Sequence, residues 1–197
     1  MKDFGEASYV LGIEIHRDRS NGILGLSQKI YIEKVLKKYN MHKYSASPAP
    51  IVKGDKFGTF QFPKNEYEAA QMKTIPYASA MGSIMYAQVC TRPDLAFITG
   101  MLGRYQSNSE INHWNAVKKG LRYIQGIDLM LTYKKSDNLE DVGYSHADFA
   151  ECVDTKKSTS GYIFTLASGA ISWKSSKQTV TASSTMQAEF VACYEAT

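Results

Sequence analysis

The stretch Gly143-Tyr144-Ser145-His146-Ala147-Asp148 is the most informative feature of this 197-residue chain. Residues 141–145 read as the approach to a strand, and if that strand continues, His146 and Asp148 share one face of the sheet, because side chains alternate. A second stretch, Thr185-Met186-Gln187-Ala188-Glu189-Phe190-Val191-Ala192, lies within a helix predicted over residues 181–196. Together the two stretches offer one histidine and two carboxylates as candidate site residues.

The stretch around His146 resembles the first catalytic strand of a ribonuclease H domain, and the stretch around Glu189 resembles the helix that supplies its second carboxylate. Other blocks similar to one family occur along the chain, in the order Gly5–Ile15, Thr91–Ala96, His113–Lys118, Lys156–Phe164 and Ile171–Gln178. This is the order of the Pol polyprotein of copia-type retrotransposons. The chain is identified as a fragment of such a polyprotein, from the C-terminal end of reverse transcriptase to the N-terminal half of RNase H.

The resemblance implies RNA-directed DNA synthesis followed by cleavage of the RNA strand in the RNA–DNA hybrid, with Mg²⁺ as the family's cofactor. It also implies that the polymerase metal site precedes residue 1 and that the remaining nuclease carboxylates follow residue 197. We therefore expect this chain alone to catalyse neither reaction. Two alternatives stay open: a non-catalytic module that binds duplex or hybrid nucleic acid, and a relic without function.

Residue-by-residue comparison with the family puts Glu189 at an inherited metal-site position and His146 where an aspartate is expected. Two-metal hydrolysis of a phosphodiester needs several converging carboxylates, and imidazole is a poor ligand for Mg²⁺. Asp148 is a weak candidate to replace the lost aspartate, since it lies about 6.6 Å further along the strand. A softer metal held by His146 and Glu189 is a further alternative. We expect an incomplete site, with Glu189 as its metal ligand and no productively bound Mg²⁺.

The pattern predicts an α+β fold in four segments: 1–42 as the end of reverse transcriptase, 43–75 as a linker, 76–128 as a helical connection and 129–197 as a truncated RNase H-like domain. In the first segment, residues 8–27 predict a β-hairpin whose first strand carries Tyr9, Leu11, Ile13 and Ile15 on one face. Asn21-Gly22 is a strong turn signal, and an amphipathic helix over 28–41 follows.

The linker is rich in proline and glycine, but Phe57, Phe60 and Phe62 are expected to dock on a neighbouring domain. Three helices are predicted over residues 76–126, the third with a capping box formed by Ser107 and Glu110. His113 is interpreted as a packing and capping residue.

The last segment is predicted to be a partial RNase H-like mixed sheet with one helix. Ser183 or Ser184 caps this helix. Ala188, Val191, Ala192 and Met186 are expected to face the sheet.

Basic residues on two predicted helices are the candidate contacts to nucleic acid: Lys34, Lys37, Lys38, Lys118, Lys119 and Arg122. The net charge of +4 and the pI of about 8.8 permit such contacts without requiring them. The expected partners are an RNA–DNA hybrid or duplex nucleic acid, together with the remainder of the polyprotein. The alternative interpretation is that these lysines form solvated helix faces.

Composition excludes several other classes of protein. No apolar stretch reaches about 18 residues, so no membrane span is expected. The three cysteines, Cys90, Cys152 and Cys193, lack metal-ligand spacing, and no zinc site is expected. A reducing intracellular setting fits this cysteine usage. Family analogy places the protein in the cytoplasm, within a virus-like particle, or in the nucleus.

Overall fold

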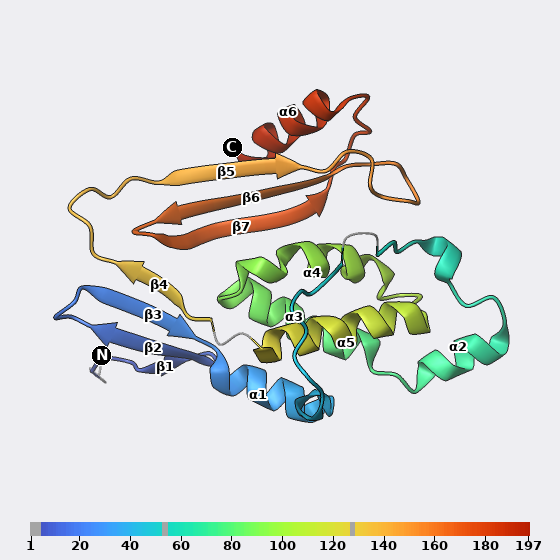
Figure 1. Cartoon of the computed structure of the whole chain (residues 1–197), viewed down its shortest axis with the longest axis horizontal. Coiled ribbons are helices and arrows are strands. Elements are labelled where there is room, and N and C mark those ends of the chain that lie inside the picture. The colour runs from blue at the N-terminus through green and yellow to red at the C-terminus, as the bar shows by residue number, and fades with distance from the viewer. Residues whose placement is uncertain (1–4, 53–54, 127–128) are drawn as a thin grey trace.

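The structure, a computed structural model, describes residues 5–52, 55–126 and 129–197. The remaining residues, 1–4, 53–54 and 127–128, belong to the first three predicted segments and lie outside this description. Figure 1 shows an antiparallel sheet next to the N-terminus, a group of packed helices, and a second sheet that carries one helix. The predicted α+β class is confirmed.

The first sheet contains four antiparallel strands in the order β1-β2-β3-β4: Tyr9–Val10, Ile13–Asp18, Ile23–Ser27 and Leu131–Lys134. The predicted continuous strand through residues 9–15 is wrong, because Leu11 and Gly12 have φ values of 51° and 80° and turn the chain between β1 and β2. The turn at Asn21-Gly22 is confirmed: it lies between β2 and β3, and Gly22 has a φ of 63°.

Strand β4 connects distant parts of the sequence. It pairs with β3, with Ile23 opposite Lys134 and Leu26 opposite Leu131. β4 falls in the last predicted segment, whereas β3 falls in the first, so these two segments share one sheet. The sequence pattern gave no sign of this pairing.

The helical unit contains α1 (Lys29–Lys38), α3 (Tyr77–Cys90), α4 (Ala96–Leu102) and α5 (Ile111–Gly126), with short 3₁₀ turns at Met41–Lys43, Pro93–Leu95 and Gly103–Tyr105. Their apolar faces form the main core of the protein, and the predicted stripe of Leu95, Ile98, Leu102 and Tyr105 is buried. The core residues are Val35, Leu36, Tyr39, Met41, Tyr77, Ala80, Met81, Ile84, Ala87, Leu95, Ile98, Leu102, Ala116, Val117, Leu121 and Ile124.

The predicted linker contains regular structure. A 3₁₀ turn spans Thr59–Gln61, and α2 spans Glu66–Lys73. Phe57 packs against the main core, and the Phe62 ring lies 6.1 Å from the Tyr105 ring, but Phe60 is exposed. Two of the three phenylalanines therefore dock as expected.

Helix α5 begins later in the sequence than predicted. The predicted capping box of Ser107 and Glu110 is wrong, because the helix starts at Ile111 and Glu110 itself precedes its first residue. The backbone N–H of Glu110 donates to Nδ1 of His113 at 3.1 Å, and a Glu110 carboxylate oxygen accepts from the Asn112 N–H at 2.8 Å. His113 thus takes the place of the glutamate or glutamine of a capping box, which agrees with its predicted capping role.

The second sheet contains β5 (Val142–Ala147), β6 (Thr159–Leu166) and β7 (Gly169–Lys177) in that order. Both strand pairs are antiparallel, so the predicted mixed sheet is wrong for the described residues. As Figure 1 shows, α6 lies against β5 and β6, and the helical unit meets the sheet near β7 through α4.

Helix α6 (Thr185–Ala196) begins at Ser184, whose side chain accepts from the Gln187 N–H. Ala188 and Ala192 face the sheet as predicted and are buried. The placement of Met186 against the sheet was wrong, since this side chain is 80% exposed. Met186, Phe190 and Tyr194 follow one another at intervals of four residues and form an exposed apolar stripe on α6.

Candidate functional site

The end of β5 and the middle of α6 bring together the two residues that sequence comparison had singled out. His146 Nδ1 lies 2.9 Å from Glu189 Oε1, and the other carboxylate oxygen of Glu189 accepts the backbone N–H of Ala147 at 3.0 Å. The side chains of His146 and Glu189 are 83% and 42% exposed. Both residues are therefore accessible from solvent at one end of the second sheet.

The local structure explains how Glu189 reaches β5. This strand lies at the edge of the sheet in the described residues, and Ala147 on it is paired with Ser160 of β6. The alanines Ala147, Ala188 and Ala192 pack together and hold α6 close to the strand. Because alanine is small, the helix approaches closely enough for a glutamate to accept a backbone N–H of the strand.

Asp148 has a different set of contacts. Its carboxylate oxygen Oδ1 accepts the N–H of Thr159 at 2.8 Å, and its own N–H donates to the Thr159 carbonyl at 3.1 Å. These two bonds close the open end of the β5–β6 pair. Asp148 thus holds the two strands together next to the site, and among the described residues its carboxylate forms no hydrogen bond or ion pair with His146 or Glu189.

The donors at this point do not fit Mg²⁺. Magnesium requires about six ligands in octahedral geometry and strongly prefers oxygen. Here one oxygen of the single carboxylate faces an imidazole nitrogen, and the other already accepts a backbone hydrogen bond. Across residues 5–52, 55–126 and 129–197, no group of three or more histidine, cysteine, aspartate or glutamate side chains is arranged to hold a metal ion.

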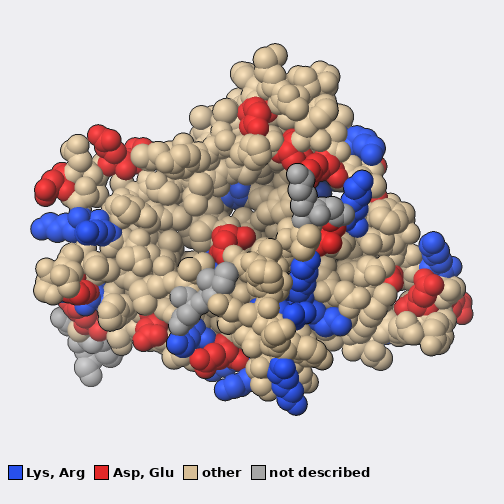
Figure 2. All heavy atoms as spheres, viewed as in Figure 1, with Lys and Arg blue, Asp and Glu red and all other residues tan. Residues whose placement is uncertain are grey.

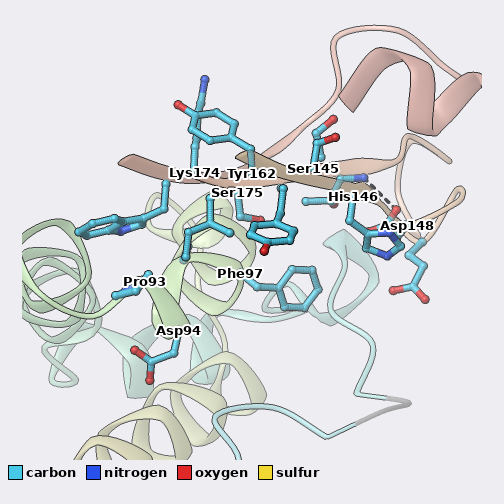
Figure 3. Close-up of a pocket in the computed structure, with 17 residues that line it drawn as sticks. Pro93, Asp94, Phe97, Ser145, His146, Asp148, Tyr162, Lys174 and Ser175 are labelled. Atoms are coloured by element: carbon cyan, nitrogen blue, oxygen red, sulfur yellow. Dashed lines mark hydrogen bonds between the residues drawn. The ribbon is translucent and has the colours of Figure 1, made fainter. Parts of the chain in front are cut away.

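A groove of about 750 Å³ lies next to the His146–Glu189 pair, between the second sheet and the segment from Pro93 to Phe97. Figure 3 shows Pro93, Asp94 and Phe97 on one side of it and His146 and Ser175 on the other. The Trp173 indole N–H donates to the Gln88 carbonyl at 3.1 Å and so connects the sheet to α3. Sequence reasoning missed this groove, because it depends on how the helical unit packs on the sheet.

The six basic candidates separate into two groups. Lys118, Lys119 and Arg122 of α5 line one concavity, which the three lysines of α1 do not join. On α1, Lys38 donates to the Ser79 hydroxyl at 3.0 Å, and Lys34 and Lys37 are exposed. Figure 2 shows basic side chains in separate groups with acidic side chains between them. The visible face therefore carries no single continuous basic field.

The helices offer no membrane-spanning segment: none within the described ranges is both long and apolar enough to cross a bilayer.

Curated proteins similar to the chain include transposon polyproteins from plants. The chain is 42% identical over 196 residues to the retrovirus-related Pol polyprotein from transposon TNT 1-94 of Nicotiana tabacum, and 33% identical over 193 residues to that from transposon RE2 of Arabidopsis thaliana. These matches cover 99% and 96% of the chain, which spans only 15% and 12% of the two polyproteins.

A third relative has a different name. The secreted RxLR effector protein 161 of Plasmopara viticola is 45% identical over 127 residues, which cover 64% of the chain and 89% of that protein. No family model matches the chain, and no solved structure matches it. The two Pol polyproteins, in contrast, match nearly the whole chain.

Proposed function

The chain belongs to the family of retrovirus-related Pol polyproteins of transposons, and from this premise we propose that it joins the end of a copia-type reverse transcriptase to the first half of an RNase H domain. In this proposal it works on RNA–DNA hybrids as one part of a longer polyprotein. The remainder of that polyprotein is its natural partner, and its place is the cytoplasm, within a virus-like particle, or the nucleus.

The observation that carries the proposal is the 2.9 Å contact between His146 and Glu189. These residues are far apart in the sequence, and the resemblance to RNase H predicted that they share one site. Three antiparallel strands followed by a helix that packs on the first two are consistent with the beginning of such a domain. The contact thus supports the assignment of this sheet and helix.

The same contact is the reason to propose that the chain alone is not a nuclease. An aspartate at position 146 would add a second carboxylate, whereas the histidine supplies no negative charge and contacts one oxygen of Glu189. Asp148 offers no replacement in this arrangement, because its carboxylate is bonded to the end of β6. Mg²⁺ would supply activation of water and stabilisation of the leaving oxygen, and the residues present do not hold it.

The test is cleavage of a labelled RNA–DNA hybrid by the purified chain with Mg²⁺ or Mn²⁺. We expect no cleavage by the natural sequence. Hybrid cleavage that Glu189→Ala abolishes would overturn the proposed inactivity, and the Lys73→Gln variant, altered at an exposed position on α2 outside the pair, controls for a contaminating nuclease.

A second measurement tests the site assignment without relying on activity. His146→Asp would place two carboxylates side by side, and we expect it to strengthen Mn²⁺ binding, seen as paramagnetic broadening of the amide signals of Ala147 and Glu189. The His146→Asn variant is the matched control, since it is similar in size but uncharged. Equal broadening in the two variants would show that positions 146 and 189 do not form the inherited site.

A second candidate function is non-catalytic binding of nucleic acid, favoured by the grouping of Lys118, Lys119 and Arg122 in one concavity. Contacts between cations and phosphates release counterions, so affinity for nucleic acid should fall steeply as salt rises. Affinity that stays constant between low and physiological salt would reject this function. If neither cleavage nor binding is found, the third alternative, a relic without function, remains.

A further inference from the structure

The concavity next to α5 combines charge, hydrogen-bonding groups and an exposed aromatic ring. It has a volume of about 480 Å³, within the range of about 300–1,000 Å³ that holds small ligands. Its wall contains three cations and no acidic residue. The lining residues are Met41, Tyr44, Ser47, Asn115, Lys118, Lys119 and Arg122.

The three cations are held in different ways. Arg122 Nε donates to the Ser45 carbonyl at 2.7 Å, and its Nη2 donates to the Ser45 hydroxyl at 3.2 Å, which fixes the guanidinium. Lys119 Nζ lies 3.0 Å from a carboxylate oxygen of Asp55. Lys118 is half-buried, and no ion pair or hydrogen bond of its ammonium occurs among the described residues. Lys118 and Arg122 are four residues apart and so lie on one face of α5.

Tyr44 adds a stacking surface to this charge. Its side chain is 56% exposed although it follows the buried Met41 by only three residues. An exposed aromatic ring beside cations suits a base and its phosphate, because stacking of a base on an aromatic side chain tolerates any sequence.

We propose that this concavity binds an unpaired nucleotide of a single-stranded nucleic acid, with its phosphate on Lys118 and Arg122 and its base on Tyr44. The inference rests on the proposed nucleic-acid function and names the form of nucleic acid that the site takes. An unpaired strand is favoured over a duplex for a physical reason. In a duplex the bases are stacked on one another, so Tyr44 would gain no partner, whereas an unpaired strand offers both a phosphate and a free base face.

Asp55 regulates this site as an internal anion that competes with phosphate. Its carboxylate oxygen Oδ2 accepts the Val52 N–H at 2.9 Å and faces Lys119 at 3.0 Å. The Val52 hydrogen bond, aided by Lys119, holds the pKa of Asp55 below its ordinary value, so the carboxylate stays charged. A nucleotide phosphate must share Lys119 with this carboxylate, and removing the carboxylate charge should release Lys119 for the ligand.

Fluorescence anisotropy with the whole chain tests the proposal, using a labelled oligothymidylate and a blunt RNA–DNA hybrid as probes at about 50 mM salt. We expect tighter binding to the oligothymidylate. Lys118→Gln should weaken that binding by about tenfold and reduce the salt slope by about one. Lys73→Gln is the matched control, because it removes the same charge from an exposed position on α2 outside the concavity and outside the candidate contacts, and it should change affinity by less than about twofold.

Three further variants separate stacking and regulation from charge. Tyr44→Ala should weaken binding of the oligothymidylate by about tenfold, whereas Tyr44→Phe keeps the ring and should retain affinity. Asp55→Asn should tighten binding by about threefold at low salt, with the gain fading as salt screens Lys119.

The outcomes separate failure of this inference from failure of the proposed function. Equal effects of Lys118→Gln and Lys73→Gln, or stronger binding to the hybrid with no effect of Tyr44→Ala, would overturn the assigned site while nucleic-acid binding itself stands. Absence of binding to either probe would overturn both. Circular dichroism of each variant checks that a loss of affinity does not come from unfolding.

Discussion

His146 Nδ1 and Glu189 Oε1 lie 2.9 Å apart at the solvent-exposed end of the second sheet. The contact crosses from a strand to a helix, and Glu189 also accepts the Ala147 N–H through its other carboxylate oxygen. The His146 side chain is 83% exposed, so the pair contributes little to folding stability by itself. The two interactions of Glu189 can therefore be separated by mutation.

His146→Ala should lower the free energy of unfolding by less than about 1 kcal/mol, as expected of an exposed pair. Glu189→Ala should cost about 1 kcal/mol more, because it also removes the acceptor of the Ala147 N–H. Urea denaturation of both variants measures the difference. Equal losses in the two variants would mean that the hydrogen bond to Ala147 does not stabilise the sheet.

His113 should make the protein less stable in mild acid. Burial lowers the pKa of His113 below its ordinary value of 6.5. A histidine with a lowered folded-state pKa supports stability above its ordinary pKa, and this contribution is lost as the pH falls from about 6.5 toward the folded-state pKa. His113→Gln keeps an acceptor at the cap of α5 but cannot titrate. The urea midpoint of the variant should vary less than that of the natural chain between about pH 5 and pH 7, whereas parallel pH profiles would contradict this prediction.

Buried tyrosines should make the protein unfold in alkali. Desolvation raises the pKa of Tyr105 from 10 to about 12 and raises that of Tyr77 as well. A raised folded-state pKa gives stability that is complete below pH 10 and is lost as the pH rises toward 12. Ultraviolet difference absorbance should show these tyrosines ionising together with unfolding. Tyr77→Phe should lose about 1 kcal/mol at neutral pH through the hydrogen bond to the Leu102 carbonyl, and it should show a weaker alkaline transition.

Hydrogen exchange should be faster in the second sheet and α6 than in the helical unit. The small core under α6 consists of Ala147, Ala182, Ala188 and Ala192, and alanine buries little apolar surface. The helical unit buries larger side chains, such as Met81 and Leu121. We expect lower protection for β5 amides than for α3 and α5 amides, measured by exchange with mass-spectrometric detection. Uniform protection over residues 76–197 would contradict this expectation.

Sequence reasoning found those features that depend on local pattern. The buried stripe on residues 95–105 followed from helical spacing, and the turn at Asn21-Gly22 followed from the preference of these residues for positive φ. The proximity of His146 and Glu189 was predicted from the resemblance to ribonuclease H. Sequence spacing alone could not predict it, because the two residues lie on separate elements.

Other features were missed because they depend on competition between local and distant interactions. Alternating apolar residues suggested one strand through residue 15, but Leu11 and Gly12 turn the chain. Met186 lies at four-residue spacing from the exposed Phe190, not from the buried Ala188 and Ala192, so the side on which the sheet meets α6 leaves it exposed. The concavity lined by Tyr44 and Lys118 needs the chain after α1 to fold back onto α5, which no sequence window contains.

The pairing of β3 with β4 constrains the order in which the elements of the chain fold. The entire helical unit separates the two strands in sequence, so the first sheet cannot be completed until that unit has brought its ends together. Closure of such a long loop is costly in entropy and slows folding. During synthesis, the outer edge of β3 in the β2–β3 hairpin stays unpaired until residue 134 leaves the ribosome. The unpaired backbone groups of that edge would expose a nascent chain to aggregation.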